Sequence, residues 1–140
     1  MEPLALSTAA IDRPDRLGGE REWGNGDLGS RHFGLEIADG FWTRFRGLML
    51  RPPPDGEVGL LLTRCASIHT AFMRYALDLA YLDRRGQVVA CVHGVKPWRT
   101  SMGPRGALHT LEFKAGDLER LGIEPGLRIE HAFFDGWNKR

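Results

Sequence analysis

The sequence predicts a mainly β (α+β) fold: a compact β-barrel or sandwich with one or two short helices packed on it. Its 140 residues suit a single domain whose core is large enough to fold without disulfide or metal crosslinks. The 18 glycines and 8 prolines favour frequent turns over long helices. Short runs rich in Val, Leu and Ile recur between these turn residues, which is typical of β-strands.

The domain is predicted to span residues 31–134, between a flexible N-terminal tail (1–30) and a short C-terminal tail (135–140). The first segment contains "RPDRLGGEREWGNGDLGS", which combines glycine, arginine and acids without a periodic apolar pattern. Such a segment buries too little surface to offset the entropy lost on ordering.

The first half of the domain is predicted to hold a strand, a helix and a second strand. The run "RHFGLEI" (31–37) predicts the first strand, and Asp39 is a candidate N-cap for a helix over 40–50. Apolar residues recur at helical spacing along one face of that helix: Phe41, Phe45, Leu48 and Met49. The run "VGLLLT" (58–63) predicts the second strand after a proline-rich turn.

A β-hairpin is the strongest local signal in the second half. The runs 77–83 and 86–93 flank a short turn with Gly86. If Asp83 pairs with Gly86, then Asp78 lies opposite Cys91. One face of the hairpin is then core, made of Leu77, Leu79, Tyr81, Val88, Ala90 and Val92. The other face mixes apolar and ionisable groups, like the wall of a half-buried pocket: Asp78, Ala80, Leu82, Val89, Cys91 and His93.

The remaining chain is predicted to contain a loop, two strands and a short helix. Residues 95–106 hold two prolines and two glycines, which predicts a loop. "ALHTLEFK" (107–114) predicts a strand, and "AGDLERLG" (115–122) predicts a short helix ended by Gly122. "GLRIEHAFF" (126–134) predicts the last strand.

Charge and apolar patterning argue against nucleic-acid binding and membrane insertion. The net charge is +1, and the bases are scattered singly instead of forming a stripe that could follow phosphates. No apolar run approaches the roughly 20 residues that span a bilayer. Glu2 stands where a signal peptide would carry bases, so we expect a cytoplasmic protein. We expect no cofactor and a monomer.

Three ionisable residues in one apolar run are candidate catalytic groups: Cys65, His69 and Asp78, within "CASIHTAFMRYALDLAYLD" (65–83). An imidazole can titrate near neutral pH, and a carboxylate between apolar neighbours needs hydrogen bonds or a cation. His69 with Asp78 could act as an acid/base pair, and Cys65 could be a nucleophile. The alternatives are a hydrogen-bonded structural histidine, an Asp78 that caps backbone amides or joins a salt bridge, and an inert buried thiol.

A binding site is the other interpretation of the same residues. Its predicted ligand contacts are Arg46, His69, Met73, Asp78 and Trp98, with Met and aromatic groups as apolar walls. Met73 and Trp98 could equally be core residues. A zinc site made of Cys65, His69, Cys91 and His93 is a weaker alternative, because the cysteines lack CxxC spacing. We therefore expect no metal.

From Phe45 to about Glu130 the chain resembles the DUF192 (UPF0127) family of small bacterial and archaeal proteins without an established activity. The matching motifs are "RGLM" (46–49), "SIHTAFM" (67–73), "LDRRGQVV" (82–89) and "GIEPG" (122–126). The resemblance implies a mainly β barrel or sandwich and supplies no substrate. Family members commonly carry an acid where this chain has Leu127, and many begin with a signal sequence.

The leading functional hypothesis is a non-enzymatic module that binds a small polar ligand or accompanies a partner, with a cleft at His69 and Asp78. The first alternative is a hydrolase-like enzyme that uses His69 and Asp78, with or without Cys65. The second is an adaptor in a cell-envelope or secretion assembly, which predicts an exposed apolar patch outside the cleft.

Overall fold

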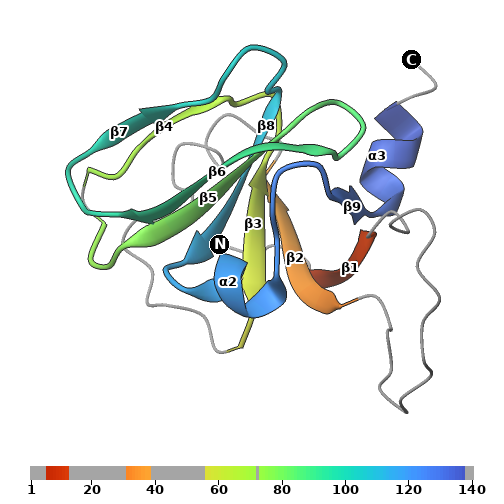
Figure 1. Cartoon of the computed structure of the whole chain (residues 1–140), viewed down its shortest axis with the longest axis horizontal. Coiled ribbons are helices and arrows are strands. Elements are labelled where there is room, and N and C mark those ends of the chain that lie inside the picture. Colours follow the sequence, from red (N-terminus) through yellow and green to blue (C-terminus); the bar gives the residue numbers. More distant parts are fainter. Residues whose placement is uncertain (1–5, 13–30, 39–55, 72, 138–140) are drawn as a thin grey trace, which may run out of the picture.

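The computed structural model describes residues 6–12, 31–38, 56–71 and 73–137, and confirms a mainly β fold. Within these ranges, seven strands form one curled sheet in the order β6-β5-β8-β3-β2-β1-β9 (Figure 1). Its strands are β1 (Leu6–Asp12), β2 (His32–Ala38), β3 (Val58–Leu62), β5 (Leu77–Leu82), β6 (Val88–Val95), β8 (His109–Lys114) and β9 (Arg128–Glu130). Two further strands form a separate ribbon, β4 (Ser67–His69) and β7 (Thr100–Met102). The helices are α2 (Asp117–Leu121) and α3 (Ala132–Trp137).

The sheet curls until its two edge strands meet at one end. The Val88 N–H donates to the Leu127 carbonyl at 2.8 Å, and the Ile129 N–H donates to the Gly86 carbonyl at 2.8 Å. Gly86 has φ 85°, and a Cβ there would lie 2.7 Å from the Ile129 carbonyl oxygen. Only glycine fits this close approach, so the β5–β6 turn is locked against β9.

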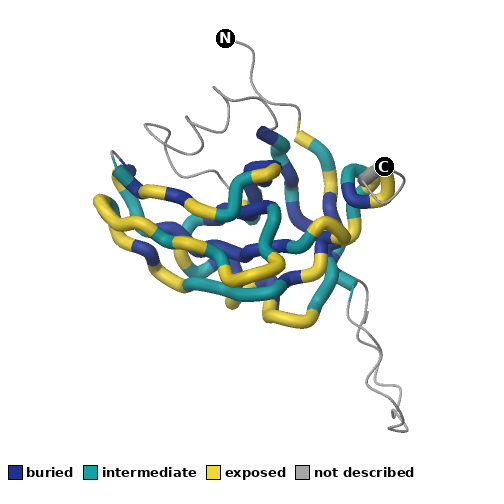
Figure 2. Tube along the Cα trace, turned by 90° about the horizontal axis from the view of Figure 1, so that it is seen from above, coloured by how far each residue is buried: buried dark blue, intermediate teal, exposed yellow. Residues whose placement is uncertain are grey.

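Two clusters of apolar side chains lie on the two faces of the sheet. One lies inside the curl with α2 and α3, and includes Phe33, Leu35, Leu61, Leu111, Phe113, Leu118 and Phe134. The other lies between the sheet and the β4–β7 ribbon, and includes Leu60, Ile68, Met73, Leu77, Leu79, Tyr81 and Val95. In Figure 2 the buried residues run along the strands, while exposed residues mark turns and outer segments. The alternation of side chains along each strand supplies both clusters.

Most predicted elements are confirmed, with four corrections. The strand at 31–37 is β2, and the helix at 115–122 is α2, where Gly122 ends the helix with φ 67°. Residues 6–12 belong to the sheet as β1, so their assignment to a flexible tail was wrong. The loop predicted at 95–106 contains the short strand β7, and the strand β4 was not predicted. The strand predicted at 126–134 is shorter, as β9, and is followed by the helix α3. The predicted helix at 40–50 lies outside the described residues.

The assumed register of the β5–β6 hairpin is wrong. Cys91 lies opposite Ala80, so it does not face Asp78. The pairing shifts between Tyr81 and Leu82, and this irregularity moves Val88 to the core inside the curl. A single shift of this kind sends a side chain to the opposite face of a strand.

A candidate binding surface on the β4–β7 ribbon

Asp78 is a structural group at the junction of β5, β6 and α2. Its side chain is 1% exposed. Oδ1 accepts the Gly94 N–H at 2.9 Å, while Oδ2 accepts the N–H groups of Gly116 at 2.9 Å and Leu118 at 3.3 Å. His93 Nδ1 lies 4.0 Å from Oδ2. These partners match the alternative in which Asp78 caps backbone amides, and its burial separates it from solvent.

The shared cleft of His69 and Asp78 is not present, which corrects the leading site hypothesis. Ile68, on β4, packs in the same cluster as Leu77 and Leu79. Asp78 alternates with these two leucines, so its side chain points to the opposite face of β5, where the amides of α2 receive it. His69 is exposed on the outer side of β4. The two side chains therefore do not line one hollow.

The other predicted site residues are also dispersed. Met73 is 7% exposed and belongs to the core beneath the ribbon, and Arg46 lies outside the described residues. Cys65 packs on the cluster under the ribbon, whereas Cys91 packs on the cluster inside the curl. Among the residues that the structure describes, no group of three His, Cys, Asp or Glu side chains gathers around a possible metal position. The zinc alternative therefore has no ligand set there.

Ser7 and His131 make a hydroxyl–imidazole contact that sequence reasoning missed. Ser7 Oγ lies 3.0 Å from His131 Nε2, and it donates to the Leu35 carbonyl at 3.1 Å. His131 Nδ1 accepts the Phe133 N–H at 3.1 Å, so in the neutral ring the proton resides on Nε2. Burial also lowers the pKa of His131, against a weaker opposing effect of Asp135. Nε2 thus donates to Ser7 and cannot act as the base that activates it.

Thr70 organises the loop that follows β6. Its side chain is 0% exposed, and its hydroxyl donates to the Lys96 carbonyl at 2.6 Å and accepts the Arg99 N–H at 2.8 Å. Its backbone N–H donates to the Arg99 carbonyl at 2.7 Å, and its carbonyl accepts the Trp98 N–H at 3.1 Å. One buried residue therefore fixes three residues of an exposed loop.

Trp98 is held in an unusual conformation on this loop. Its φ is 63°, in the left-handed region that costs a bulky residue about 1–3 kcal/mol. Its side chain is nevertheless 62% exposed, so burial of the ring does not repay that strain. The hydrogen bonds from Thr70 maintain the conformation. A strained, fixed backbone that presents an aromatic ring to solvent is typical of a contact residue.

The ribbon is anchored on the sheet at its other end. The Tyr81 hydroxyl donates to Ser101 Oγ at 2.6 Å, and burial raises the pKa of Tyr81, so this hydroxyl stays protonated. The Gly103 N–H donates to the Ala66 carbonyl at 2.7 Å. A Cβ on Gly103 would lie 2.7 Å from the Tyr81 ring, so the ribbon approaches the sheet closely there. The outer face of the ribbon is thus a defined surface.

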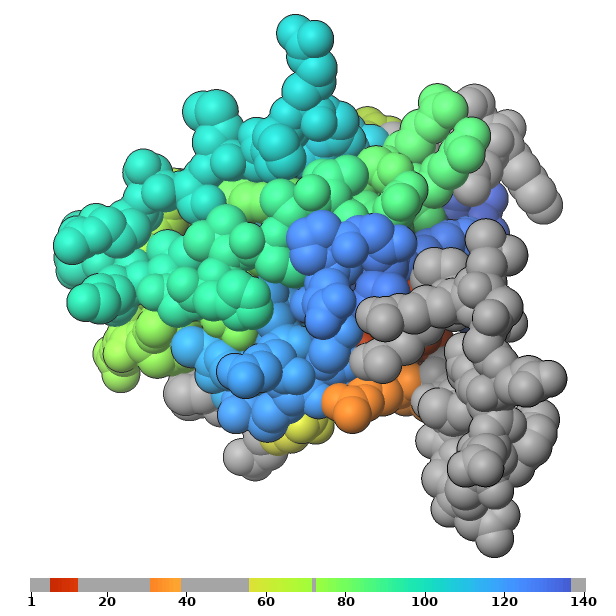
Figure 3. All heavy atoms as spheres, viewed as in Figure 1, coloured from red at the N-terminus to blue at the C-terminus, as the bar shows by residue number. Residues whose placement is uncertain are grey.

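That outer face carries apolar and polar groups that point away from the core. Ser67 pairs with Met102 and His69 pairs with Thr100, and all four are exposed. Met102 is 82% exposed, the highest value among the exposed large apolar side chains described. The chain around residue 100 forms the left and upper rim of the molecule in Figure 3. Of the predicted ligand contacts within the described residues, His69 and Trp98 lie on this exposed surface, whereas Met73 and Asp78 are buried.

The segments that carry these apolar groups are also positively charged. The two segments that build the ribbon and its loops, 64–76 and 96–108, contain no Asp or Glu. They contain five exposed bases: Arg64, Arg74, Lys96, Arg99 and Arg105. This pairing of two acid-free segments is a signal in the sequence, although only the β4–β7 pairing shows that they are neighbours. We call the surface formed by these bases with His69, Trp98 and Met102 the ribbon surface.

Replacing Thr70 with Val is expected to loosen the loop and lower the free energy of unfolding by about 1–3 kcal/mol. Valine keeps the shape of the side chain but leaves the Lys96 carbonyl and the Arg99 N–H without the hydroxyl. Amide hydrogen exchange should speed up at 96–99 and stay unchanged in β8. Ser101→Ala, which removes a partner of Tyr81 only, is the control. Equal exchange at 96–99 in both variants would contradict the role of Thr70.

The fold and the surface define a small, single-domain β protein with an exposed basic and apolar surface. Within the described ranges, no helix is long and apolar enough to cross a membrane. The chain belongs to the DUF192 family, described as uncharacterized ACR, whose profile it matches over residues 25–131. The UPF0127 protein PF1050 of Pyrococcus furiosus is 37% identical over 108 residues, which are 75% of this chain and 87% of that protein.

Two crystal structures share the fold. One is of a protein from Sinorhizobium meliloti 1021 described as a candidate transcription regulator, with TM-score 0.76 and 21% identity over 95% of this chain and 98% of that one. The other is of a protein of unknown function from Novosphingobium aromaticivorans, with TM-score 0.73 and 22% identity over 91% of this chain and 86% of that one. At these identities the likeness establishes the architecture alone.

Proposed function

We propose that this protein is a non-enzymatic accessory module that docks an acidic segment of a partner protein on the ribbon surface. The observation that carries the proposal is the pair of exposed apolar side chains, Trp98 and Met102, in two segments that hold five exposed bases and no Asp or Glu. Protein interfaces are enriched in Trp, Met and Arg, and their most important contacts are often Trp and Arg.

The charge of the surface specifies the partner. Guanidinium groups form planar, paired hydrogen bonds with carboxylates, and four of the five bases of the ribbon surface are arginines. A segment that alternates acids with apolar residues would pair with the arginines and cover Trp98 and Met102 together. Long-range attraction between opposite charges would also speed association and make it sensitive to salt.

The conformation of Trp98 supports the same function. Ordering a side chain on binding costs about 0.5–1.5 kcal/mol, and a loop that is already fixed avoids part of that loss. Thr70 supplies this order before any partner arrives. The first alternative from the sequence, a hydrolase-like enzyme that uses His69 and Asp78 as acid and base, has no geometric support, since Asp78 is enclosed by backbone amides.

A peptide-display selection against the full chain tests the proposal. We expect enrichment of peptides that combine Asp or Glu with large apolar residues. Their affinity should fall at least about tenfold with Trp98→Ala, with Met102→Ser or with Arg99→Glu, because each removes a central contact. Leu6→Ser is the matched control, since Leu6 is also a large exposed apolar residue (63%) but lies on β1. This control should bind normally.

Three outcomes would contradict the proposal. The first is a selection that yields no acidic peptides. The second is peptides that bind the Trp98, Met102 and control variants equally well. The third is that the Trp98 and Met102 variants lose binding to vesicles of anionic phospholipid, or to single-stranded DNA, while no peptide needs these two side chains for binding. That result would assign the ribbon surface to a membrane or to nucleic acid.

A further inference from the structure

We propose that a separate cavity, between the β5–β6 turn and the loop that joins β7 to β8, binds a small multivalent oxyanion. The cavity has a volume of about 490 Å³ and is open to solvent. Such a volume lies in the range of small-molecule sites. It is lined by Asp83, Arg84, Arg85, Gln87, Gly106, Ala107 and Leu108. None of these residues belongs to the β4–β7 ribbon strands.

The backbone around the cavity is fixed on both sides. On the turn side, the Gly86 N–H donates to the Asp83 carbonyl at 3.1 Å, and the Arg85 carbonyl accepts Arg128 Nε at 3.2 Å. On the loop side, the Leu108 N–H donates to the Leu82 carbonyl at 2.8 Å. A ligand would therefore meet walls that are already in place, which reduces the entropy lost on binding.

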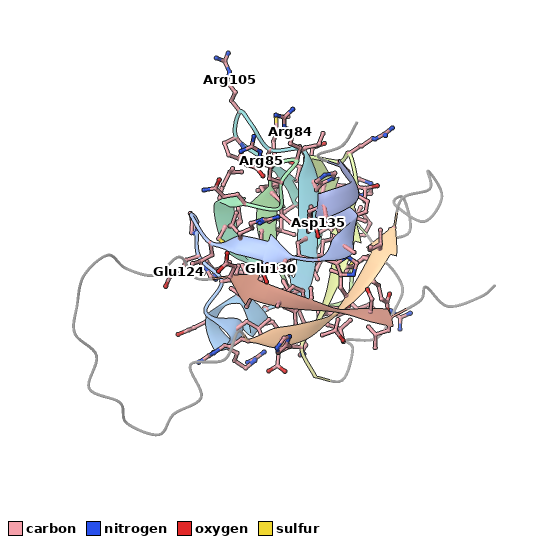
Figure 4. All side chains as sticks on the ribbon, turned by 90° about the vertical axis from the view of Figure 1, so that its right-hand side faces the viewer. Arg84, Arg85, Arg105, Glu124, Glu130 and Asp135 are labelled. Atoms are coloured by element: carbon pink, nitrogen blue, oxygen red, sulfur yellow. The ribbon has the colours of Figure 1, made fainter. Side chains whose placement is uncertain are left out.

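Arginines dominate the charge at the cavity. Arg84 and Arg85 line it, and Arg105, which is also counted in the ribbon surface, directly precedes the lining residue Gly106. Figure 4 shows these three arginines at one end of the molecule, apart from Glu124, Glu130 and Asp135 lower on the same face. All three are exposed, so no buried ion pair consumes their charge. Guanidinium groups from two loops can approach one anion from two sides.

The only carboxylate in the lining is directed into its own turn. Asp83 Oδ1 accepts the Arg85 N–H at 2.8 Å and the Gln87 N–H at 3.0 Å. These bonds form a local turn of the kind that Asp commonly builds, and they hold this oxygen on the backbone. With three arginines and one acid, the formal charge is +2. The site thus matches a ligand with two or more negative charges.

The ligand chemistry that fits is a carboxylate or phosphate group repeated on one small molecule. Ala107 and Leu108 are half-buried and add a short apolar wall, so the ligand can carry a few carbon atoms between its charges. Citrate is a probe for polycarboxylates, and pyrophosphate is a probe for phosphate groups. The probe that binds with the higher affinity shows whether the oxyanion is a carboxylate or a phosphate.

Two-dimensional NMR titration of the full chain with each probe tests the site. We expect saturable shifts at amides 83–87 and 105–108, and at least about tenfold weaker binding for the double variant Arg84→Gln/Arg85→Gln. Arg84→Lys/Arg85→Lys should recover part of the affinity, because it restores the charge without the planar fork. The double variant Arg74→Gln/Arg99→Gln, which removes two exposed arginines of the ribbon surface, is the charge-matched control and should change the affinity less than twofold.

The proposal is overturned if the shifts centre elsewhere, if Arg84→Gln/Arg85→Gln binds normally, or if Arg74→Gln/Arg99→Gln weakens binding as much as Arg84→Gln/Arg85→Gln does. Shifts that rise without saturation to high probe concentration would also overturn it, because they indicate screening by salt instead of a site. Trp98→Ala should bind both probes normally. This independence separates a failure of the cavity from a failure of partner docking.

Discussion

Replacing Asp78 with Ala is expected to lower the free energy of unfolding by about 3–4 kcal/mol. The change leaves the N–H groups of Gly94, Gly116 and Leu118 without the carboxylate that accepts them, in a place that is 1% exposed. An orphaned buried donor costs about 1–3 kcal/mol, and partial hydration of the exposed Gly94 reduces the sum. Urea unfolding followed by circular dichroism measures the loss.

Two further variants make this result specific. Asp78→Asn keeps the volume of the side chain and one accepting oxygen, so its loss should be smaller than that of the alanine variant. Asp135→Ala removes a carboxylate that is 71% exposed and 3.4 Å from Arg128, and should change stability by less than about 0.5 kcal/mol. An alanine variant at Asp78 whose stability stays within about 1 kcal/mol of the parent would contradict the structural role, because surface substitutions usually have effects of that size or smaller.

Acidification from pH 7 to pH 4 is expected to remove up to about 3 kcal/mol of stability through His109 alone. Its side chain is 0% exposed and lies 5.5 Å from the Phe133 ring, between centroids. Burial lowers the pKa of His109 from 6.5 to about 4, and the charge of Arg64 adds to this effect, while Asp83 opposes it. Nδ1 also accepts the Arg64 N–H at 2.9 Å, which a proton on that nitrogen would prevent.

The direction of this pH dependence follows from whether the unfolded chain or the folded protein takes up the proton on His109 first. As the pH falls through 6.5, His109 becomes charged in the unfolded chain and stays neutral in the folded protein down to about pH 4. The contribution of His109 to the free energy of unfolding is therefore complete above pH 6.5 and is lost progressively as the pH falls from 6.5 to about 4. His109→Gln retains an acceptor for the Arg64 N–H but does not titrate. Unfolding by urea at pH 7 and pH 4.5 should show a smaller pH dependence for this variant, and equal dependence in both proteins would contradict the assignment.

Local patterns in the sequence predicted the strongest elements of the fold. The hairpin of β5 and β6 and the strand β8 are confirmed, because their apolar runs are bounded by turn residues that act locally. The register of the hairpin was wrong, since the irregularity near Tyr81 and Leu82 leaves no mark in the sequence. A shift of one residue is enough to exchange Val88 and Val89 between the two faces of the sheet.

Elements that depend on distant partners could not be predicted. β1 reads "LSTAAID", whose small residues carry a weak strand signal, and it is stable because β2 and β9 pair with it on both sides. β4 and β7 have three residues each, which is too short for a periodic signal, so only their pairing makes them strands. The separation of His69 from Asp78 likewise depends on which face of β5 the ribbon covers.

The order of strands in the curled sheet has a consequence for protein synthesis. β8 lies between β3 and β5 in the sheet. Of the seven described strands that form this sheet, β8 is the sixth in sequence order and is followed by β9. Before it emerges, the nascent chain holds two sheet fragments, β1-β2-β3 and β5-β6, that have no strand to join them. Both fragments expose unpaired edges at that stage, which are sites for aggregation. The protein therefore completes its fold late, and chaperones that protect open strand edges should bind the nascent chain until β8 and β9 are in place.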